Sequence, residues 1–273
     1  MVYYGGKIPN SLLYAAMLVA SVLAGGAADR WGTAPPFLAG AVLFGSGSLT
    51  VGIADSAVVF LAGRALQGLG AGLMVVVLYV VVVRRYAEQA RPKVFAVMAS
   101  AWVIPSVGGP PLAALVTQHV GWRWVFLAIP PLLVPAALAL IPGLRASRVP
   151  DAGEQPRKFA RLSLYAAGTA AGGTLLQYAV QSGSPPVTVW GTVGAIGLLA
   201  VSVPPLLPAG TLQARPGTPA FVLLRGLLAG AFFGTEVLFP LLVARNSGGN
   251  ATVGGLLLAA GSVGWAGGSW LQS

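Results

Sequence analysis

The chain has 273 residues, of which 56% are hydrophobic and 8% are charged, and its mean hydropathy is +0.81. A soluble domain averages about 25% charged residues, so this composition excludes a disordered chain and argues against an ordinary water-soluble enzyme. There is no cysteine and one histidine, His119, which excludes a metal centre built from these two ligands. We therefore expect an all-α integral membrane protein, a polytopic bundle of transmembrane helices.

Apolar runs long enough to cross a bilayer occur along the whole chain, where a helical span needs about 20 such residues. In chain order they cover residues 10–28, 36–54, 57–83, 94–117, 123–141, 162–181, 187–207, 220–243 and 252–271. Short connections rich in proline, glycine and charge separate them. The pattern predicts about nine spans, and no alternating pattern favours a β-barrel.

The net charge of +10 is distributed unevenly between the two predicted sides of the membrane. If the first span runs from outside to inside, the inner connections hold eleven positive residues: Arg30, Arg84, Arg85, Arg91, Lys93, Arg145, Arg148, Arg157, Lys158, Arg161 and Arg215. The outer side holds three, which are Lys7, Arg123 and Arg245. This bias predicts that the basic segment 142–161 is cytoplasmic, next to anionic lipid, and it argues against nucleic acid as a partner.

The connection after the first predicted span reads G-G-A-A-D-R-W-G over residues 25–32. It resembles the cytoplasmic signature of the major facilitator superfamily, G-x-L-A-D-R-x-G-R-K, with Thr33 and Ala34 in place of the usual basic pair. An acid at a helix end, with closely approaching glycines, can form a charge latch with a neighbouring helix. The resemblance implies such a conformational latch, and the alternative is a tight solvated turn; the latch residues would be Gly25, Asp29, Arg30 and Gly32.

Residues 64–72 read R-A-L-Q-G-L-G-A-G, which resembles the family's fourth-helix motif R-x-x-Q-G-x-G. An arginine inside a span is costly in lipid and usually faces a bundle interior or a water-filled cavity. The small residues at 68, 70 and 72 allow a neighbouring helix to approach closely. The resemblance implies that Arg64 faces the transport path and takes part in proton coupling; the alternative is that it snorkels to the outer interface. Gln67 either lines a cavity or makes an interhelical hydrogen bond.

Residues 102–112 read W-V-I-P-S-V-G-G-P-P-L and resemble the fifth-helix motif of drug:proton antiporters. Prolines remove backbone donors and bend helices, and in a membrane such a bend is tolerated only against protein or water. We therefore expect a bend at a cavity, formed by Pro105, Gly108, Gly109, Pro110 and Pro111. The run G-W-R-W-V-F at 121–126 resembles the opening of the sixth helix in the same subfamily, and we interpret its tryptophans as interfacial anchors.

These three motifs in order resemble those of the superfamily's drug:proton antiporters, and the two extra predicted spans in 162–207 resemble the inserted helices of its fourteen-span members. The resemblance implies an N-terminal bundle in 1–141 with family helices two to six, a cytoplasmic loop in 142–161, two extra central helices in 162–207, and the start of a C-terminal bundle in 220–273. On this alignment the family's first helix and last four helices are missing, which is expected of a fragment of a longer protein.

Glu236 is the one acid deep inside a predicted span. An intramembrane carboxylate is a candidate proton carrier or cation partner, and the alternative is a carboxyl group hydrogen-bonded within the bundle. The sequence contains no phosphate-binding loop and no nucleophile motif, which argues against an enzyme and against an ATP-driven pump. We expect no cofactor.

The resemblance implies a secondary active transporter that couples protons to the efflux of drugs or small amphipathic compounds. It would be a multi-pass protein of the cell inner (plasma) membrane, with a small-molecule substrate, protons and the lipid bilayer as partners, and a monomer is favoured. The alternative is a membrane protein that does not transport, or an inactive truncated fragment.

Overall fold

The computed structural model describes residues 8–146, 156–246 and residue 264. Every regular element in these residues is a helix: α1 (Ile8–Trp31), α2 (Ala34–Gly52), α3 (Ala57–Arg85), α4 (Arg91–His119), α5 (Arg123–Leu127), α6 (Ile129–Arg145), α7 (Pro156–Gln181), α8 (Pro185–Ser202), the short 3₁₀ turns η1 (Pro204–Leu206) and η2 (Thr211–Gln213), and α9 (Thr218–Asn246).

Five stretches within the described residues are long and apolar enough to cross a membrane. They are Leu12–Trp31, Ala34–Gly52, Ala57–Arg85, Arg123–Arg145 and Pro185–Leu206. Backbone N–H and C=O groups find no water in a bilayer, so apolar segments of this length satisfy them internally as helices. The predicted polytopic helical bundle is therefore confirmed.

The predicted spans and the observed helices differ mainly at their ends. Within the predicted segment 142–161, α6 continues to Arg145 and α7 begins at Pro156. Proline is favoured in a first helical turn, where its missing N–H would have had no partner. The ninth predicted span, 252–271, lies outside the described residues apart from residue 264.

The predicted span 123–141 is divided into two helices at Ala128. Pro130 and Pro131 lack the N–H groups that would bond to the carbonyls of Phe126 and Leu127, four residues earlier. The helical hydrogen-bond pattern is therefore interrupted at this point, and α6 restarts with proline in its first turn.

Tight turns connect the antiparallel neighbours. Gly32, between α1 and α2, has φ +80°, and Gly183, between α7 and α8, has φ +66°. These left-handed values favour glycine, which has no Cβ to clash with the following carbonyl. The turns reverse the chain within a few residues, and the second of them brings α7 and α8 side by side.

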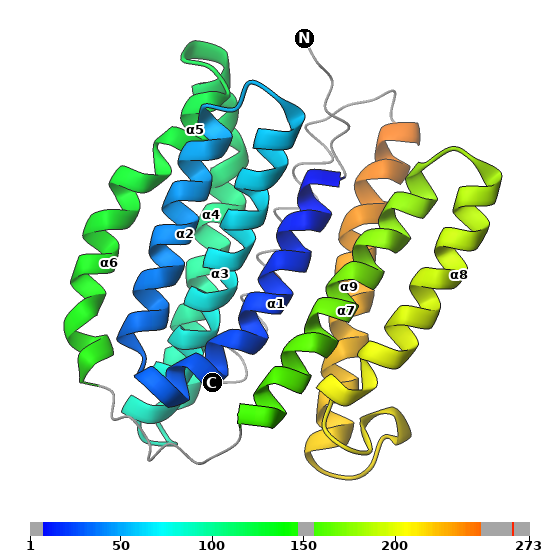
Figure 1. The fold of residues 1–273 in the computed structure, drawn as a ribbon. Coiled ribbons are helices and arrows are strands. Elements are labelled where there is room, and N and C mark those ends of the chain that lie inside the picture. Colours follow the sequence, from blue (N-terminus) through cyan, green and yellow to red (C-terminus); the bar gives the residue numbers. More distant parts are fainter. Residues whose placement is uncertain (1–7, 147–155, 247–263, 265–273) are drawn as a thin grey trace. The chain divides into compact units, whose positions relative to one another are not determined.

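The described helices divide between two compact units. Unit 1 comprises Met1–Arg85 and Val116–Leu206, and unit 2 comprises Tyr86–Leu115 and Leu207–Ser273. Within unit 1 the helices contact one another in the order α6, α2, α3, α1, α7, α8, which can be followed across Figure 1. Within unit 2, η2 packs against α9. The division into bundles and loop implied by the family resemblance stays a prediction.

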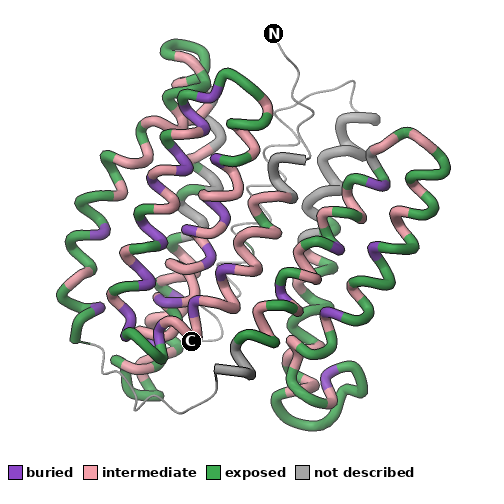
Figure 2. Tube along the Cα trace, viewed as in Figure 1, coloured by how far each residue is buried: buried purple, intermediate pink, exposed green. Residues whose placement is uncertain are grey.

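The core of unit 1 lies where α1, α2, α3 and α6 meet (Figure 2). Its buried residues are Ala24, Ala28, Phe37, Ala41, Val77, Ala137 and Leu144. They come from the second halves of α1 and α3, the first half of α2, and the middle and last turn of α6. The outer helices α6 and α8 instead expose large apolar side chains, among them Leu132 and Trp190, as expected of surfaces that face lipid.

Candidate functional site

Helix α3 packs on two neighbours through glycines on different faces. A Cβ atom added at Gly70 would lie 2.5 Å from the carbonyl oxygen of Gly40 in α2, whereas one added at Gly72 would lie 2.8 Å from Cβ of Ala20 in α1. Gly68 also faces α1, where an added Cβ would be 2.9 Å from Cβ of Ala16. The predicted close approach at 68, 70 and 72 is confirmed, and the structure adds that the motif serves two helices.

The polar side chains of this motif join into a directional chain of hydrogen bonds. Nη1 of Arg64 donates to Oε1 of Gln67 at 2.9 Å, and Nε2 of Gln67 donates to Oγ of Ser48 in α2 at 3.0 Å. Oγ of Ser48 then donates to the carbonyl oxygen of Phe44 at 2.8 Å. Gln67 is 2% exposed and Ser48 is fully buried. Of the two roles open to Gln67, the structure shows the interhelical hydrogen bond.

Arg64, the first residue of these linked hydrogen bonds, lies within the apolar stretch of α3. It is seven residues after Ala57, the start of α3, which corresponds to about 10 Å along the helix axis. The side chain is partly buried, and its guanidinium group is held by the amide of Gln67 one turn further along. This places a cation against the bundle, although its part in proton coupling stays a prediction.

The predicted latch residue Asp29 has a partner on a neighbouring helix. Its Oδ1 atom lies 2.6 Å from Nη2 of Arg84 at the end of α3, and Nη1 of Arg84 also donates to the carbonyl oxygen of Ala28 at 3.2 Å. The guanidinium carbon of Arg30 lies 5.7 Å from the ring centroid of Trp31 instead. The cation of the ion pair therefore comes from α3 and not from the loop.

Sequence reasoning did not single out Arg84, although a signal for it existed. Helices α1 and α3 run in the same direction, so their C-terminal ends lie on the same side of the membrane. The arginine that ends the valine-rich run of α3 is thus a natural partner for an acid at the end of α1. Within the described residues, Gly25 makes no close approach, because a Cβ added there would have no neighbour within 4 Å, and its part in a latch stays a prediction. Gly32 instead serves the turn described above.

A second contact at this end involves Thr33, which stands where the family signature has a basic residue. Thr33 is 1% exposed, and its Oγ1 atom donates to the carbonyl oxygen of Leu144 at 2.7 Å. Leu144 is in the last turn of α6, where helix carbonyls lack intrahelical partners. A neutral hydrogen bond thus joins the start of α2 to the end of α6.

At the opposite end of unit 1, Arg123 joins the start of α5 to the connection between α2 and α3. Its Nη2 atom donates to the carbonyl oxygen of Ala54 at 3.1 Å and lies 3.3 Å from Oδ1 of Asp55. The guanidinium carbon lies 5.0 Å from the ring centroid of Trp122. Trp122 and Trp124 are both partly exposed, which is consistent with their interpretation as interfacial anchors.

The remaining predicted site residues lie in α4 and α9. Helix α4 is continuous through 105–111, and an added Cβ at Gly108 or Gly109 would have no neighbour within 4 Å among the residues that the structure describes. The side chains of Pro110, Pro111 and Glu236 lie outside the described part of the chain. The bend with Pro105 and the role of Glu236 therefore stay predictions.

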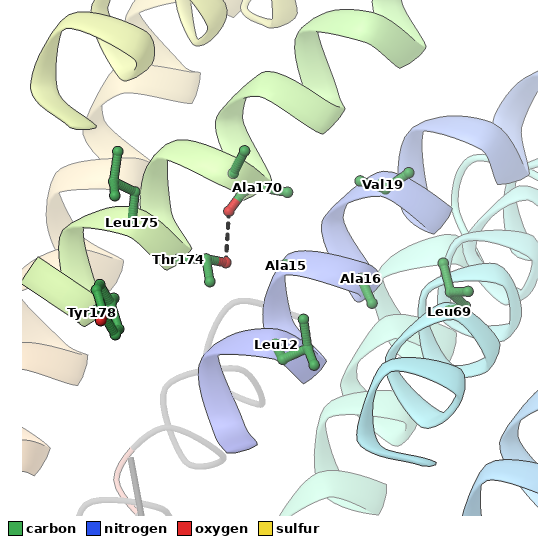
Figure 3. A pocket seen from close by; sticks show the side chains of 10 residues that line it. Leu12, Ala15, Ala16, Val19, Leu69, Ala170, Thr174, Leu175 and Tyr178 are labelled. Atoms are coloured by element: carbon green, nitrogen blue, oxygen red, sulfur yellow. Dashed lines mark hydrogen bonds between the residues drawn. The ribbon is translucent and has the colours of Figure 1, made fainter. Parts of the chain in front are cut away.

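A cavity of about 640 Å³ lies between α1 and α7, with one contribution from α3 (Figure 3). Its lining includes two residues with a hydroxyl group, Thr174 and Tyr178. Oγ1 of Thr174 donates to the carbonyl oxygen of Ala170 at 2.9 Å, so this hydroxyl is already used within α7. The other lining residues are apolar: Leu12, Ala15, Ala16, Val19, Leu69, Ala170, Ala171 and Leu175. The cavity suits an apolar group and offers no charge.

Comparison with known proteins links the whole described bundle to one family. The model of the Major Facilitator Superfamily matches residues 8–273. The multidrug resistance protein MdtL of Escherichia fergusonii is 32% identical over 153 residues, which are 55% of this chain and 39% of that protein. The MdtL protein of Escherichia coli K12 shows the same identity and coverage.

A multidrug resistance protein B homolog of Mycobacterium tuberculosis H37Rv is also similar. It is 34% identical over 104 residues, which are 38% of this chain and 19% of that protein. The chain thus spans 39% of the length of the MdtL relatives and less of the mycobacterial one.

Proposed function

Because the chain belongs to the Major Facilitator Superfamily, we propose that its protein is a secondary active transporter, which exports small amphipathic or drug-like compounds in exchange for protons. The chain is a multi-pass membrane protein of a transporter family, and it is not an enzyme. We assign the transporter to the cell inner (plasma) membrane, with the ends of α1, α3 and α6 on the cytoplasmic side.

The observation that carries the proposal is the hydrogen-bonded pair of Arg64 and Gln67 inside a membrane span. A guanidinium group within a span costs several kcal/mol of insertion free energy, on the order of 2.5–3.5, so it is retained where it serves a function. The buried amide of Gln67 holds this cation in a defined position. Such a fixed charge is suited to a step in which a proton or a substrate moves past it.

Two further observations support the choice of substrate class and energy source. The similar proteins that cover part of this chain are named multidrug resistance proteins. The cavity beside α1 is apolar and would accept the apolar part of an amphipathic compound. For the proton, we assign the carrier role to Glu236 on α9, since an ionisable side chain in a span is a functional candidate by default.

The proposal is tested with the full-length protein in liposomes that have an acidic lumen. A fluorescent amphipathic cation such as ethidium, added outside, should accumulate in the lumen as protons leave, and a pH dye should report that proton movement. A protonophore should abolish both signals. If neither ethidium nor a panel of amphipathic compounds moves in response to the pH gradient, the protein is not a proton-coupled exporter, and the non-transporting alternative holds.

A further inference from the structure

We propose that Ser48 is a positioning residue, which fixes the orientation of the Gln67 amide and thereby the acceptor that holds Arg64. The motif of α3 contains Arg64 and Gln67, but Ser48 is nineteen residues earlier than Gln67 in the chain, in α2. The role we assign to Ser48 in transport rests on the function proposed above. The effect of Ser48 on the position of Arg64 does not depend on that function.

The argument begins with the direction of each hydrogen bond. A glutamine amide has a donor end and an acceptor end, whereas a guanidinium group only donates. Gln67 turns its oxygen toward Arg64, so its NH₂ group needs an acceptor on the other side, and Oγ of Ser48 is that acceptor at 3.0 Å. Ser48 can accept because its own hydrogen is used by the carbonyl oxygen of Phe44 at 2.8 Å.

The reverse orientation of the amide would place two donors face to face. The NH₂ group of Gln67 would then point at the guanidinium group of Arg64, and its oxygen would point at Ser48. Ser48 could turn its hydrogen toward that oxygen, but this would break its bond to Phe44 and would not remove the clash at Arg64. The network therefore has one fully satisfied arrangement, in which Ser48 holds the NH₂ group of Gln67 from α2.

The contact between Ser48 and Gln67 lies in a tightly packed part of the interface between α2 and α3. Ser48 is fully buried and Gln67 is 2% exposed. The adjacent Gly47 is so close to α3 that an added Cβ would lie 2.7 Å from the backbone nitrogen of Gln67 and 2.8 Å from the carbonyl oxygen of Gly63. A polar atom left without a partner here would stay without one, so its side chain would move.

The test compares Ser48→Ala with Ser46→Ala. Ser46 is two residues away on the same helix, and its Oγ atom donates to Leu43 within α2, so its loss leaves Gln67 untouched. We expect Ser48→Ala to slow proton-coupled transport about three- to tenfold and to shift its pH profile. Ser46→Ala should remain within about twofold of wild type. In a Gln67→Leu background, Ser48→Ala should have no additional effect, because Ser48 acts through Gln67.

A second measurement does not depend on transport. In ¹⁵N-arginine-labelled full-length protein, the guanidinium signal of Arg64, assigned with Arg64→Lys, should show faster rotation in Ser48→Ala than in wild type, and no change in Ser46→Ala. If wild type fails to transport but this difference is present, the proposed function fails and the positioning role stands. If a folded Ser48→Ala protein keeps the wild-type signal, or slows transport equally in the Gln67→Leu background, the positioning role is wrong.

Discussion

The carboxylate of Asp29 lies 2.6 Å from the guanidinium group of Arg84, and this contact ties the end of α1 to the end of α3. Arg84 is 15% exposed and Asp29 is 67% exposed, so the cation is shielded while the acid faces water. Exposed ion pairs contribute about 0–1 kcal/mol to stability because solvent screens them. Arg84 also binds the Ala28 backbone, so the pair defines a geometry more than it adds stability.

We predict that Asp29→Asn slows transport several-fold while the protein still inserts and folds. The mutation removes the charge that holds Arg84 to α1 and leaves the backbone bond to Ala28 in place. Transport rate in liposomes and the thermal unfolding temperature are the measurements. Glu88→Gln is the control, since Glu88 is exposed and its partner Arg91 is three residues away in the sequence. Equal slowing by both variants would show that the contact between α1 and α3 is irrelevant.

We predict that Glu236→Gln abolishes proton-linked efflux and leaves expression unchanged. Glutamine has nearly the same shape as glutamate but cannot bind and release a proton in this pH range. The measurements are resistance of cells to the exported compound and proton flux in liposomes. Thr235→Val is the control, because its hydroxyl bonds to Ala231 in the same helix and carries no proton. Wild-type proton flux in Glu236→Gln would remove Glu236 from the mechanism.

We predict that Gly70→Ala destabilises the bundle, whereas Gly197→Ala does not. A Cβ at position 70 would lie 2.5 Å from the carbonyl oxygen of Gly40, so two backbones would have to separate. Gly197 in α8 is exposed, and among the described residues it has no neighbour within 4 Å of an added Cβ. Alanine favours a helix by about 1 kcal/mol over glycine. Thermal unfolding in detergent should fall for the first variant only; similar values would contradict the backbone contact.

We predict that Thr33→Val lowers the free energy of unfolding by about 1 kcal/mol, because the carbonyl of Leu144 loses its buried donor. Valine keeps nearly the same shape, so packing changes little. The control is Thr174→Val. The hydroxyl group of Thr174 donates to the carbonyl oxygen of Ala170 in the same helix, so its loss breaks no contact between helices. Denaturant or thermal unfolding of both variants is the measurement. A larger loss in the control would mean that the link between α2 and α6 has no special weight.

Much of the fold follows from local composition. Apolar runs must become helices in a bilayer, so α1, α2 and α3 lie within a few residues of their predicted positions. The close approach at 68, 70 and 72 was also readable, since small residues in a span indicate helix contacts. The sequence analysis predicted one span over 123–141 and not its division at Ala128. Hydropathy describes side chains, so it does not register the backbone N–H groups that Pro130 and Pro131 lack.

The candidate site was predictable only in part, for a related reason. Arg64 and Gln67 can be found from the sequence, because polar residues are costly in lipid and therefore stand out within an apolar span. The partners of Gln67, Asp29 and Thr33 on other helices are 19 to 111 residues away in the chain. Such separations depend on how helices cross, which no local pattern encodes.

By itself, then, the sequence determined three things: that this protein is a helical membrane protein, that certain helix ends carry positive charge, and that α3 bears a polar motif among glycines. The tertiary structure alone decided that the motif's glycines serve two different helices, that Arg84 is the partner of Asp29, and that Ser48 completes the chain from Arg64. The physical reason is range. Hydropathy and the pairing of backbone N–H and C=O groups act within one segment. The contacts of Gln67 with Ser48, of Asp29 with Arg84 and of Thr33 with Leu144 instead need two helices in register, and register is set by the packing of whole helices.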